Sequence, residues 1–332
     1  MNFLIGLFWN SREGRLRCGY RLLLQIVVSI LLMIGFSIGA IPILYLLGPH
    51  ASEDMVFGGV QVVAITATVG LACLFLDRRH LSSLGIRFNT RWWVDLVAGL
   101  LMGAGMMSLI FVIEYQMGWI TLAENDLPWN SLLPAFFGWL ALFIGVGISE
   151  ELLSRGYHLK NISEGLSGLG KTPSFLIATV ISSAFFGLLH AWNPNADFIS
   201  ILNICLAGVM FCIGRLCTGS LAAPIGLHIT WNFFQGPVYG FAVSGSETAG
   251  SILKVKSTTN ELWTGGEFGP EAGLMGVFAI FIMSGMYWCW PRDNSASREH
   301  QNHETDSTDT SHIGQNLLQL ADFQGHSGTL PS

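Results

Sequence analysis

The chain has 332 residues, of which 51% are hydrophobic and 11% are charged, and its formal net charge is -6. Soluble globular domains carry about 25% charged residues, so this composition excludes an ordinary water-soluble domain and indicates an integral membrane protein. The six cysteines form no C-x-x-C pair and lie mostly inside apolar runs, so they imply neither a disulfide framework nor a zinc knuckle and are expected to pack as small apolar side chains within helices.

Apolar runs of about 20 residues can cross the hydrocarbon core of a bilayer as α-helices. Eight such runs lie at about 22–47, 56–76, 92–114, 132–154, 174–191, 199–217, 221–242 and 272–290. The first run is about twice as long as the apolar region of a secretory signal peptide, so it predicts a retained span. The expected fold class is an all-α polytopic membrane protein of about eight transmembrane helices with an intramembrane cavity.

The basic residues predict an orientation, because short cytoplasmic loops collect Lys and Arg. One side of the spans holds Arg12, Arg15, Arg17, Arg21, Arg78, Arg79, Arg87, Arg91, Arg155, Lys160, Lys171, Arg215, Arg292 and Arg298. The opposite side holds only Lys254 and Lys256. We therefore expect a cytoplasmic N-terminal segment (1–21), a membrane domain (22–290) and a cytoplasmic tail (291–332).

Two segments differ from the apolar spans in composition. The Gly-rich stretch 243–270 is expected to form a flexible external loop. The tail is rich in Ser, Thr, Asn, Gln and His and has too few apolar residues to fold alone, so it is expected to be disordered.

The first cluster of residues that could take part in catalysis ends the fourth run, in the sequence Ser149-Glu150-Glu151-Leu152-Leu153-Ser154-Arg155. An ionisable group within a span costs about 2.5–3.5 kcal/mol on insertion scales, so its presence needs a reason. Glu151 and Arg155 are four residues apart with the acid first, which favours a helical ion pair. Glu150 is turned by about 100° and remains available. The alternative is an interfacial salt bridge at the cytoplasmic end of a helix.

The second cluster, Phe186-Gly187-Leu188-Leu189-His190, closes the fifth run. Phe186 and His190 are four residues apart and so share one helix face. A single histidine at a helix end is more often interfacial than catalytic, so this cluster alone predicts little.

The third cluster, His228-Ile229-Thr230-Trp231-Asn232, lies inside the seventh run. His228 and Asn232 are four residues apart, which places an imidazole and a carboxamide side by side on one buried face. Buried polar groups need partners. The alternative to a functional role is hydrogen bonding between helices, worth about 0.6 kcal/mol per contact in membrane proteins.

Together these side chains are those needed to hydrolyse an amide within a bilayer. A general base must deprotonate water, which suits Glu150 with His190. Fixed donors must stabilise the tetrahedral oxyanion, which suits His228 and Asn232. The ion pair of Glu151 with Arg155 would support them.

The three motifs E-E-x-x-x-R, F-x-x-x-H and H-x-x-x-N, in this order on successive helices, resemble the signature of the CPBP intramembrane proteases. This family includes type II CAAX prenyl endopeptidases and bacteriocin-processing Abi proteins, and the resemblance covers about residues 130–242. It implies that Glu150 and His190 activate water, that His228 and Asn232 bind the oxyanion, and that Glu151 and Arg155 support them. It also implies a bacterial inner-membrane location and membrane-embedded or lipidated peptide substrates, of the CAAX or the leader and bacteriocin type.

The family is often called a metalloprotease, and Glu150, His190 and His228 are the candidate ligands of a divalent metal such as zinc. No H-E-x-x-H motif or other zinc spacing occurs, so the need for a metal stays open. The sequence has no basic nucleic-acid patch and no phosphate-cradling loop, so no nucleic-acid partner is expected.

The depths of two candidate residues conflict under simple span boundaries. Glu150 would lie near the exit of the fourth span, whereas His190 would lie about 25 Å along the fifth at a rise of 1.5 Å per residue. We therefore predict that the fourth helix extends to about Lys160. We also predict that the fifth is tilted or starts outside the hydrocarbon core.

Two other function classes remain open at this point. The intramembrane Glu150, His190 and His228 could relay protons or coordinate a cation in a transporter or channel, although the chain lacks two halves with paired interrupted helices. The same cavity could also serve a membrane peptide-binding or immunity protein that does not cleave its ligand.

Overall fold

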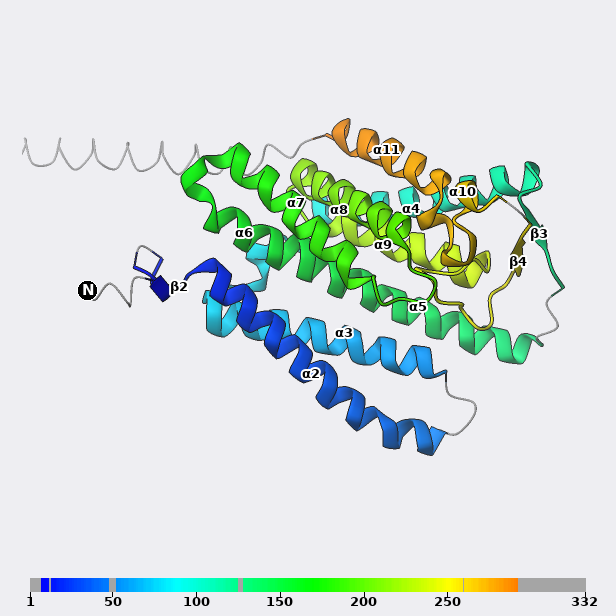
Figure 1. Ribbon diagram of the computed structural model, residues 1–332, viewed down its shortest axis with the longest axis horizontal. Helices are drawn as coiled ribbons and strands as arrows, with labels where there is room; N and C mark the ends of the chain where they lie inside the picture. Colours follow the sequence, from blue (N-terminus) through cyan, green and yellow to red (C-terminus); the bar gives the residue numbers. More distant parts are fainter. Residues whose placement is uncertain (1–6, 12, 48–51, 125–127, 259, 292–332) are drawn as a thin grey trace, which may run out of the picture. The chain divides into compact units, whose positions relative to one another are not determined.

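The computed structural model describes residues 7–11, 13–47, 52–124, 128–258 and 260–291. Residues up to Trp290 form one helical unit (Figure 1). The predicted tail 291–332 lies, apart from Pro291, outside the described residues, so its expected disorder stays a prediction.

Helices dominate the unit, and short turns and two small antiparallel ribbons connect them. The helices are α2 (Cys18–Leu47), α3 (Glu53–Leu71), α4 (Thr90–Gln116), α5 (Trp129–Glu151), α6 (Leu159–Gly165), α7 (Lys171–Leu189), α8 (Phe198–Thr218), α9 (Ala222–Phe233), α10 (Glu261–Thr264) and α11 (Leu274–Trp288). The π-helical turns are η2 (Ala72–Asp77), η4 (Leu152–His158) and η6 (Phe234–Val238). The 3-10 turns are η3 (Leu81–Leu84), η5 (Ser167–Leu169), η7 (Gly266–Phe268) and η8 (Pro270–Ala272). Strand β1 (Trp9–Asn10) pairs with β2 (Arg15–Leu16), and β3 (Ile120–Leu122) pairs with β4 (Val255–Ser257).

The lengths of these helices confirm a polytopic all-α membrane protein. Six helical stretches in the described ranges are long and apolar enough to cross a bilayer, at Cys18–Leu46, Glu53–Asp77, Thr90–Gln116, Trp129–Gly165, Lys171–Leu189 and Phe198–Thr218. They correspond to the first six expected spans. The other two expected spans contain α9, of 12 residues before η6, and α11, of 15 residues. At 1.5 Å per residue these are shorter than a hydrocarbon core of about 30 Å, so eight full spans are not established.

Helix α9 lies inside the protein. All of its residues except Thr230 are buried, and it packs most extensively against α4. Glycines make this contact possible: a Cβ at Gly99 would lie 2.1 Å from the carbonyl oxygen of Ala223, and one at Gly226 would lie 2.3 Å from that of Leu96. The two backbones therefore touch, and this glycine seam fixes the position of α9.

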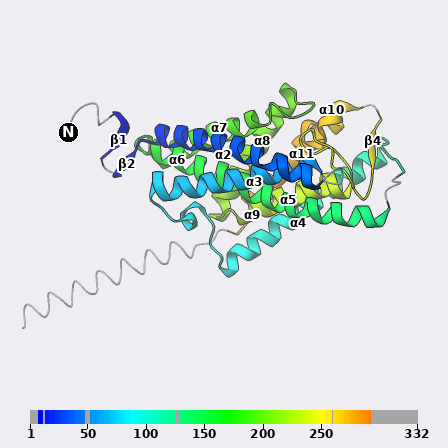
Figure 2. The ribbon, with the colours of Figure 1, turned by 90° about the horizontal axis from the view of Figure 1, so that it is seen from below.

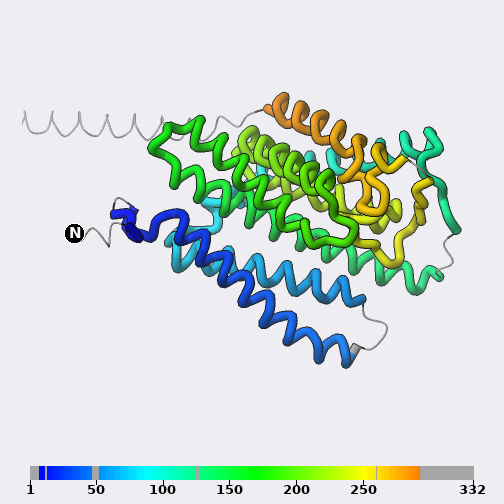
Figure 3. Tube along the Cα trace, viewed as in Figure 1, coloured from blue at the N-terminus to red at the C-terminus, as the bar shows by residue number. Residues whose placement is uncertain are grey.

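Helices α2 and α3 form a pair on one side of the unit. In two perpendicular views α3 runs beside α5, and α2 packs along α3 (Figures 2 and 3). Only 6% of the most apolar stretch of α2 is buried in the protein, against 44% for α8. The exposed apolar side chains of α2 therefore suit contact with lipid rather than with a protein core.

A network of ion pairs joins three helix ends. Arg21, in the first turn of α2, pairs with Asp77 at the end of η2. Arg15 contacts both Asp77, at 3.2 Å, and Glu164 near the end of α6, at 3.0 Å. Arg79 also pairs with Glu164, at 2.6 Å. These three ends therefore lie at the same end of the helical unit, in agreement with the alternation used to assign the spans.

The segment 243–270 is not the flexible external loop that its glycine content indicated. Its described residues form β4, α10 and η7, and they are tied to the helices. Trp139 of α5 donates to the carbonyl oxygen of Ala249 at 2.8 Å. Ser244 donates both its backbone N–H and its hydroxyl to Glu271, each at 2.8 Å. These hydrogen bonds order a segment whose composition alone favours flexibility.

Candidate active site

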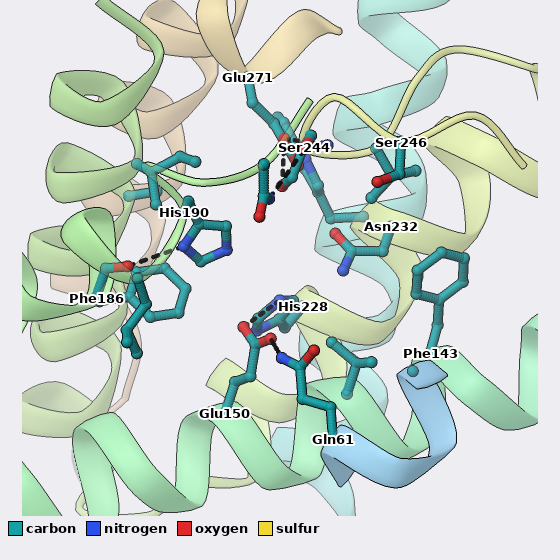
Figure 4. A pocket seen from close by; sticks show the side chains of 18 of the residues that line it. Gln61, Phe143, Glu150, Phe186, His190, His228, Asn232, Ser244, Ser246 and Glu271 are labelled. Carbon is teal, nitrogen blue, oxygen red and sulfur yellow. Dashed lines mark hydrogen bonds and ion pairs between the residues drawn. The ribbon is translucent and has the colours of Figure 1, made fainter. Parts of the chain in front are cut away.

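Four of the six predicted site residues line one cavity of about 500 Å³ (Figure 4). They are Glu150 on α5, His190 at the end of α7, and His228 and Asn232 on α9. We call these four residues the motif set. The other two, Glu151 and Arg155, lie behind the cavity wall with side chains that are 0% exposed.

The position of Glu150 depends on how far its helix continues. Helix α5, turn η4 and helix α6 form one unbroken stretch, Trp129–Gly165, of 37 residues. This confirms the predicted extension of the fourth helix to about Lys160, and the stretch continues to Gly165, which places Glu150 well inside it. The predicted tilt or outer start of the fifth span, α7, stays a prediction.

The neighbouring acids Glu150 and Glu151 point in different directions. Glu151 Oε1 accepts a hydrogen bond from Arg155 Nη1 at 3.0 Å, as the four-residue spacing predicts. Glu150 faces the cavity, where its Oε1 has a weak contact of 3.4 Å with Gln61 Nε2. No donor in the described residues bonds to Glu150 Oε2. One carboxylate is thus committed to an ion pair, while the other is available in the cavity.

His228 joins the two acids. Its Nδ1 lies 3.1 Å from Glu151 Oε1, and its Nε2 lies 3.8 Å from Glu150 Oε2. The ring also stacks on Phe211, with centroids 5.3 Å apart. Asn232, one helical turn later, lines the same cavity. The predicted pairing of imidazole and carboxamide on one face of α9 is therefore present.

His190 is fixed by the last turn of its own helix. Its Nδ1 lies 2.8 Å from the carbonyl oxygen of Phe186, and the two rings are 4.9 Å apart. Arg155 also contacts Phe186, with its guanidinium carbon over the Phe186 ring at 4.1 Å from the ring centroid. Arg155 therefore connects the E-E-x-x-x-R motif to the F-x-x-x-H motif.

The two histidines differ in the hydrogen bonds that their free ring nitrogens can make. A carbonyl oxygen only accepts, so His190 Nδ1 must be the donor to Phe186, and the neutral ring then presents Nε2 as an acceptor. The carboxylate of Glu151 also only accepts, so His228 Nδ1 must carry a proton. When Nε2 is protonated as well, His228 is a donor at both nitrogens. The cavity can therefore hold an acceptor at His190 opposite a donor at His228.

A comparison with protein families identifies the segment that carries these residues. Residues 131–234 match the family model described as "Type II CAAX prenyl endopeptidase Rce1-like". This segment belongs to the CPBP family of CAAX proteases. The match confirms the resemblance drawn from the three motifs. Searches of the curated proteins and of the solved structures found no match.

The CPBP segment does not form the whole cavity. Gln61 from α3, Ser244 from the segment after η6, and Glu271 from η8 also line it, and all three lie outside residues 131–234. We call these three residues the accessory set. The sequence analysis missed them. The available signals were the carboxamide of Gln61, inside the apolar run of α3, and the carboxylate of Glu271, directly before the apolar run of α11.

The cavity does not fit the expected metal site. Glu150, His190 and His228 all line it, but the described residues contain no group of three His, Cys, Asp or Glu side chains arranged to hold a metal ion. His228 Nδ1 is directed at Glu151, so that Nε2 is the ring nitrogen on the side of Glu150. The mechanism proposed for these residues therefore uses no metal.

Proposed function

We propose that this chain is an intramembrane endopeptidase that hydrolyses peptide bonds in membrane-embedded or lipidated substrates, of the CAAX or the leader and bacteriocin type. The observation that carries the proposal is the pairing of His190 and His228 around Glu150 in one cavity of a CPBP segment. One histidine can accept a hydrogen bond and the other can donate one. Hydrolysis of an amide needs both.

Glu150 and His190 form the half of the site that activates water. Glu150 removes one proton from a water molecule, and His190 Nε2 accepts a hydrogen bond from the other O–H. The water oxygen then attacks the carbonyl carbon of the scissile peptide. Glu150 Oε2 is suited to this task because it accepts no hydrogen bond from the described residues; His228 Nε2, the cation beside it, lies 3.8 Å away.

His228 and Asn232 form the half that stabilises the oxyanion. The imidazolium of His228 donates through Nε2, with Glu151 holding Nδ1 at 3.1 Å, and Asn232 donates through its amide. As the C–N bond breaks, the leaving amine takes the proton that Glu150 removed from water. The products are a new carboxylic acid, which still holds the second water proton, and an amine. The acid then gives this proton to the amine or to water, and His228 keeps its own proton throughout.

Glu151 and Arg155 position His228 rather than touch the substrate. Glu151 Oε1 contacts both Arg155 Nη1, at 3.0 Å, and His228 Nδ1, at 3.1 Å. Arg155 in turn lies against the rings of Phe186 and Phe211, at 4.1 and 4.8 Å. This packing ties the helices of all three motifs together.

We further propose that the protein resides in a bacterial inner membrane with both termini in the cytoplasm. The distribution of Lys and Arg supports this orientation. Fusions of a fluorescent protein and of alkaline phosphatase to the N-terminus and to residue 290 test it. Fluorescence without phosphatase activity at both points is expected, and phosphatase activity at either point would contradict the orientation.

The function is tested by cleavage of membrane-anchored and prenylated reporter peptides by purified protein in detergent. Wild type is compared with Glu150→Ala, His228→Ala and the control Glu267→Gln, which changes an exposed carboxylate outside the cavity. Cleavage by wild type and the control, but by neither cavity variant, is expected, and a chelator should leave the rate unchanged. Folded wild type that binds the peptides without cutting any of them would instead establish a binding role.

A further inference from the structure

Apart from the His228 imidazolium of the proposed mechanism, the charged side chains that line the cavity are acids. They are Asp54 in the first turn of α3, Glu150 and Glu271. No Lys or Arg is among the described lining residues. Arg155 lies nearby, but it is fully buried, paired with Glu151 and covered by aromatic rings. Among the described lining residues, a negative group that enters the cavity would therefore find no cation other than the His228 imidazolium, which lies 3.8 Å from Glu150.

Glu271 is the acid that the proposed mechanism does not use. Figure 4 places it on the far side of His190 from Glu150, beside Ser244. Its Oε2 accepts two hydrogen bonds from Ser244, from the backbone N–H and the hydroxyl, both at 2.8 Å. Ser244 in turn has its carbonyl oxygen bonded by Asn193 Nδ2 at 3.0 Å. The carboxylate is thus held in place at the cavity surface, away from the general base.

A carboxylate fixed in this way selects substrates by charge. A substrate that presented its free C-terminal carboxylate to the cavity would meet like charges, and like charges brought together disfavour binding. A Lys or Arg side chain or an N-terminal ammonium would meet a prepared counter-ion. The donors from Ser244 occupy Oε2 only, so Oε1 can face such a cation.

We propose that Glu271 is a specificity-determining residue that binds a cationic group of the substrate close to the scissile bond. The inference rests on the proposed endopeptidase function and names its substrate class. The substrates are cationic membrane peptides that are cut away from their free carboxyl terminus.

The test uses quenched peptides of one membrane-spanning sequence in which a single Lys is moved one position at a time. Each has a counterpart with Gln at that position, and each is made with a free or an amidated C-terminus and with a free or an acetylated N-terminus. The enzymes are wild type, Glu271→Gln, Glu271→Asp and the control Glu267→Gln, each checked for helical content by circular dichroism.

For at least one Lys position, or for the free N-terminus, wild type should cut the cationic peptide with kcat/KM roughly tenfold above its neutral counterpart, as one charge pair allows. Glu267→Gln should keep this ratio, Glu271→Asp should reduce it, and Glu271→Gln should bring it to about one. A C-terminal free carboxylate should not improve cleavage by any of the enzymes.

Three outcomes separate the inference from the proposed function. A Lys preference that survives in folded Glu271→Gln, or a preference for the free carboxyl terminus, would overturn the role of Glu271 while the endopeptidase function stands. If Glu271→Gln does not fold, an unchanged ratio in Glu271→Asp overturns the role equally. Absence of cleavage of every peptide by wild type would overturn the proposed function itself.

Discussion

The motif set and the accessory set line the same cavity but are supported in different ways. His228 of the motif set is held by Glu151, a fully buried residue that also pairs with Arg155. Glu271 of the accessory set is held by Ser244, whose φ of 47° lies in the left-handed region that non-glycine residues rarely adopt. One support is a buried ion pair between helices, and the other is a strained turn between short elements.

This difference indicates a division of tasks within the proposed enzyme. The motif set comes from the CPBP segment and contains the groups that hydrolysis requires. The accessory set comes from α3 and from the chain after residue 234, outside the segment that matches the family model. Chemistry and substrate choice should therefore respond to different substitutions.

The largest expected effect on catalysis comes from a change to Glu150, the proposed general base. Glu150→Gln keeps the size of the side chain but removes its capacity to take a proton, so kcat should fall by about 10²–10⁴-fold. Cleavage of a reporter peptide under saturating conditions measures this. The Glu267→Gln variant should match wild type, and a Glu150→Gln variant with more than a tenth of wild-type kcat would remove Glu150 from the mechanism.

The next effect should be on the oxyanion donors. Asn232→Ala removes one donor from the motif set, and loss of one such donor costs about 10²–10³-fold in kcat. KM should change little, because the donor acts on charge that develops only in the transition state. A rise in KM at constant kcat would show that Asn232 binds the substrate instead.

The two adjacent acids should separate activity from stability. Glu151→Gln leaves the guanidinium of Arg155 buried without its counter-ion, which costs about 3–5 kcal/mol of folding stability. Glu150→Gln should change stability far less, because its carboxylate has no ion pair with an arginine. Unfolding midpoints in detergent compare the two variants, and equal midpoints would contradict the assignment of Glu151 as the support.

The smallest effect concerns pH and the accessory set. Burial raises the pKa of Glu271 above its ordinary value, and outweighs the opposing hydrogen bonds from Ser244 and the nearby His190 and His228. Protonation of Glu271 removes its negative charge. As the pH is lowered, the proposed preference for a Lys peptide over a Gln peptide should therefore disappear while the pH is still above the ordinary Glu pKa of about 4.3. The ratio of the two kcat/KM values cancels every effect of pH that the two peptides share. A ratio that is constant down to that pH would contradict the assignment.

Helical periodicity made most of the six candidate site residues predictable. Residues four apart share a helix face, so Glu151 with Arg155 and His228 with Asn232 could be paired from the sequence, and the structure places them as expected. The accessory set could not be found in this way. Ser244 and Glu271 meet only because the segment after η6 folds back onto the helices, and no local period records such a contact.

The number of spans could not be read from hydropathy for a related reason. Hydropathy does not distinguish an apolar helix that faces lipid from one that is enclosed by protein. Helix α9 is apolar because α4, α5 and α8 surround it, and its glycine Gly226 fits the backbone of α4 rather than the bilayer. Helix α2 is also apolar, but its side chains are exposed and suit contact with lipid rather than with protein.

The glycine seam between α4 and α9 also has a consequence for motion. Because carbonyl groups of each helix fill the space where a Cβ of the other would stand, as at Gly99 and Gly226, α9 cannot slide or rotate while α4 stays in place. Helix α2, which contributes Met33 and Ser37 to the cavity, is barely buried, and a Cβ at its Gly35 or Gly39 would meet nothing within 4 Å. If the proposed function holds, a substrate should therefore enter by displacement of α2 and α3, while His228 on α9 keeps its position.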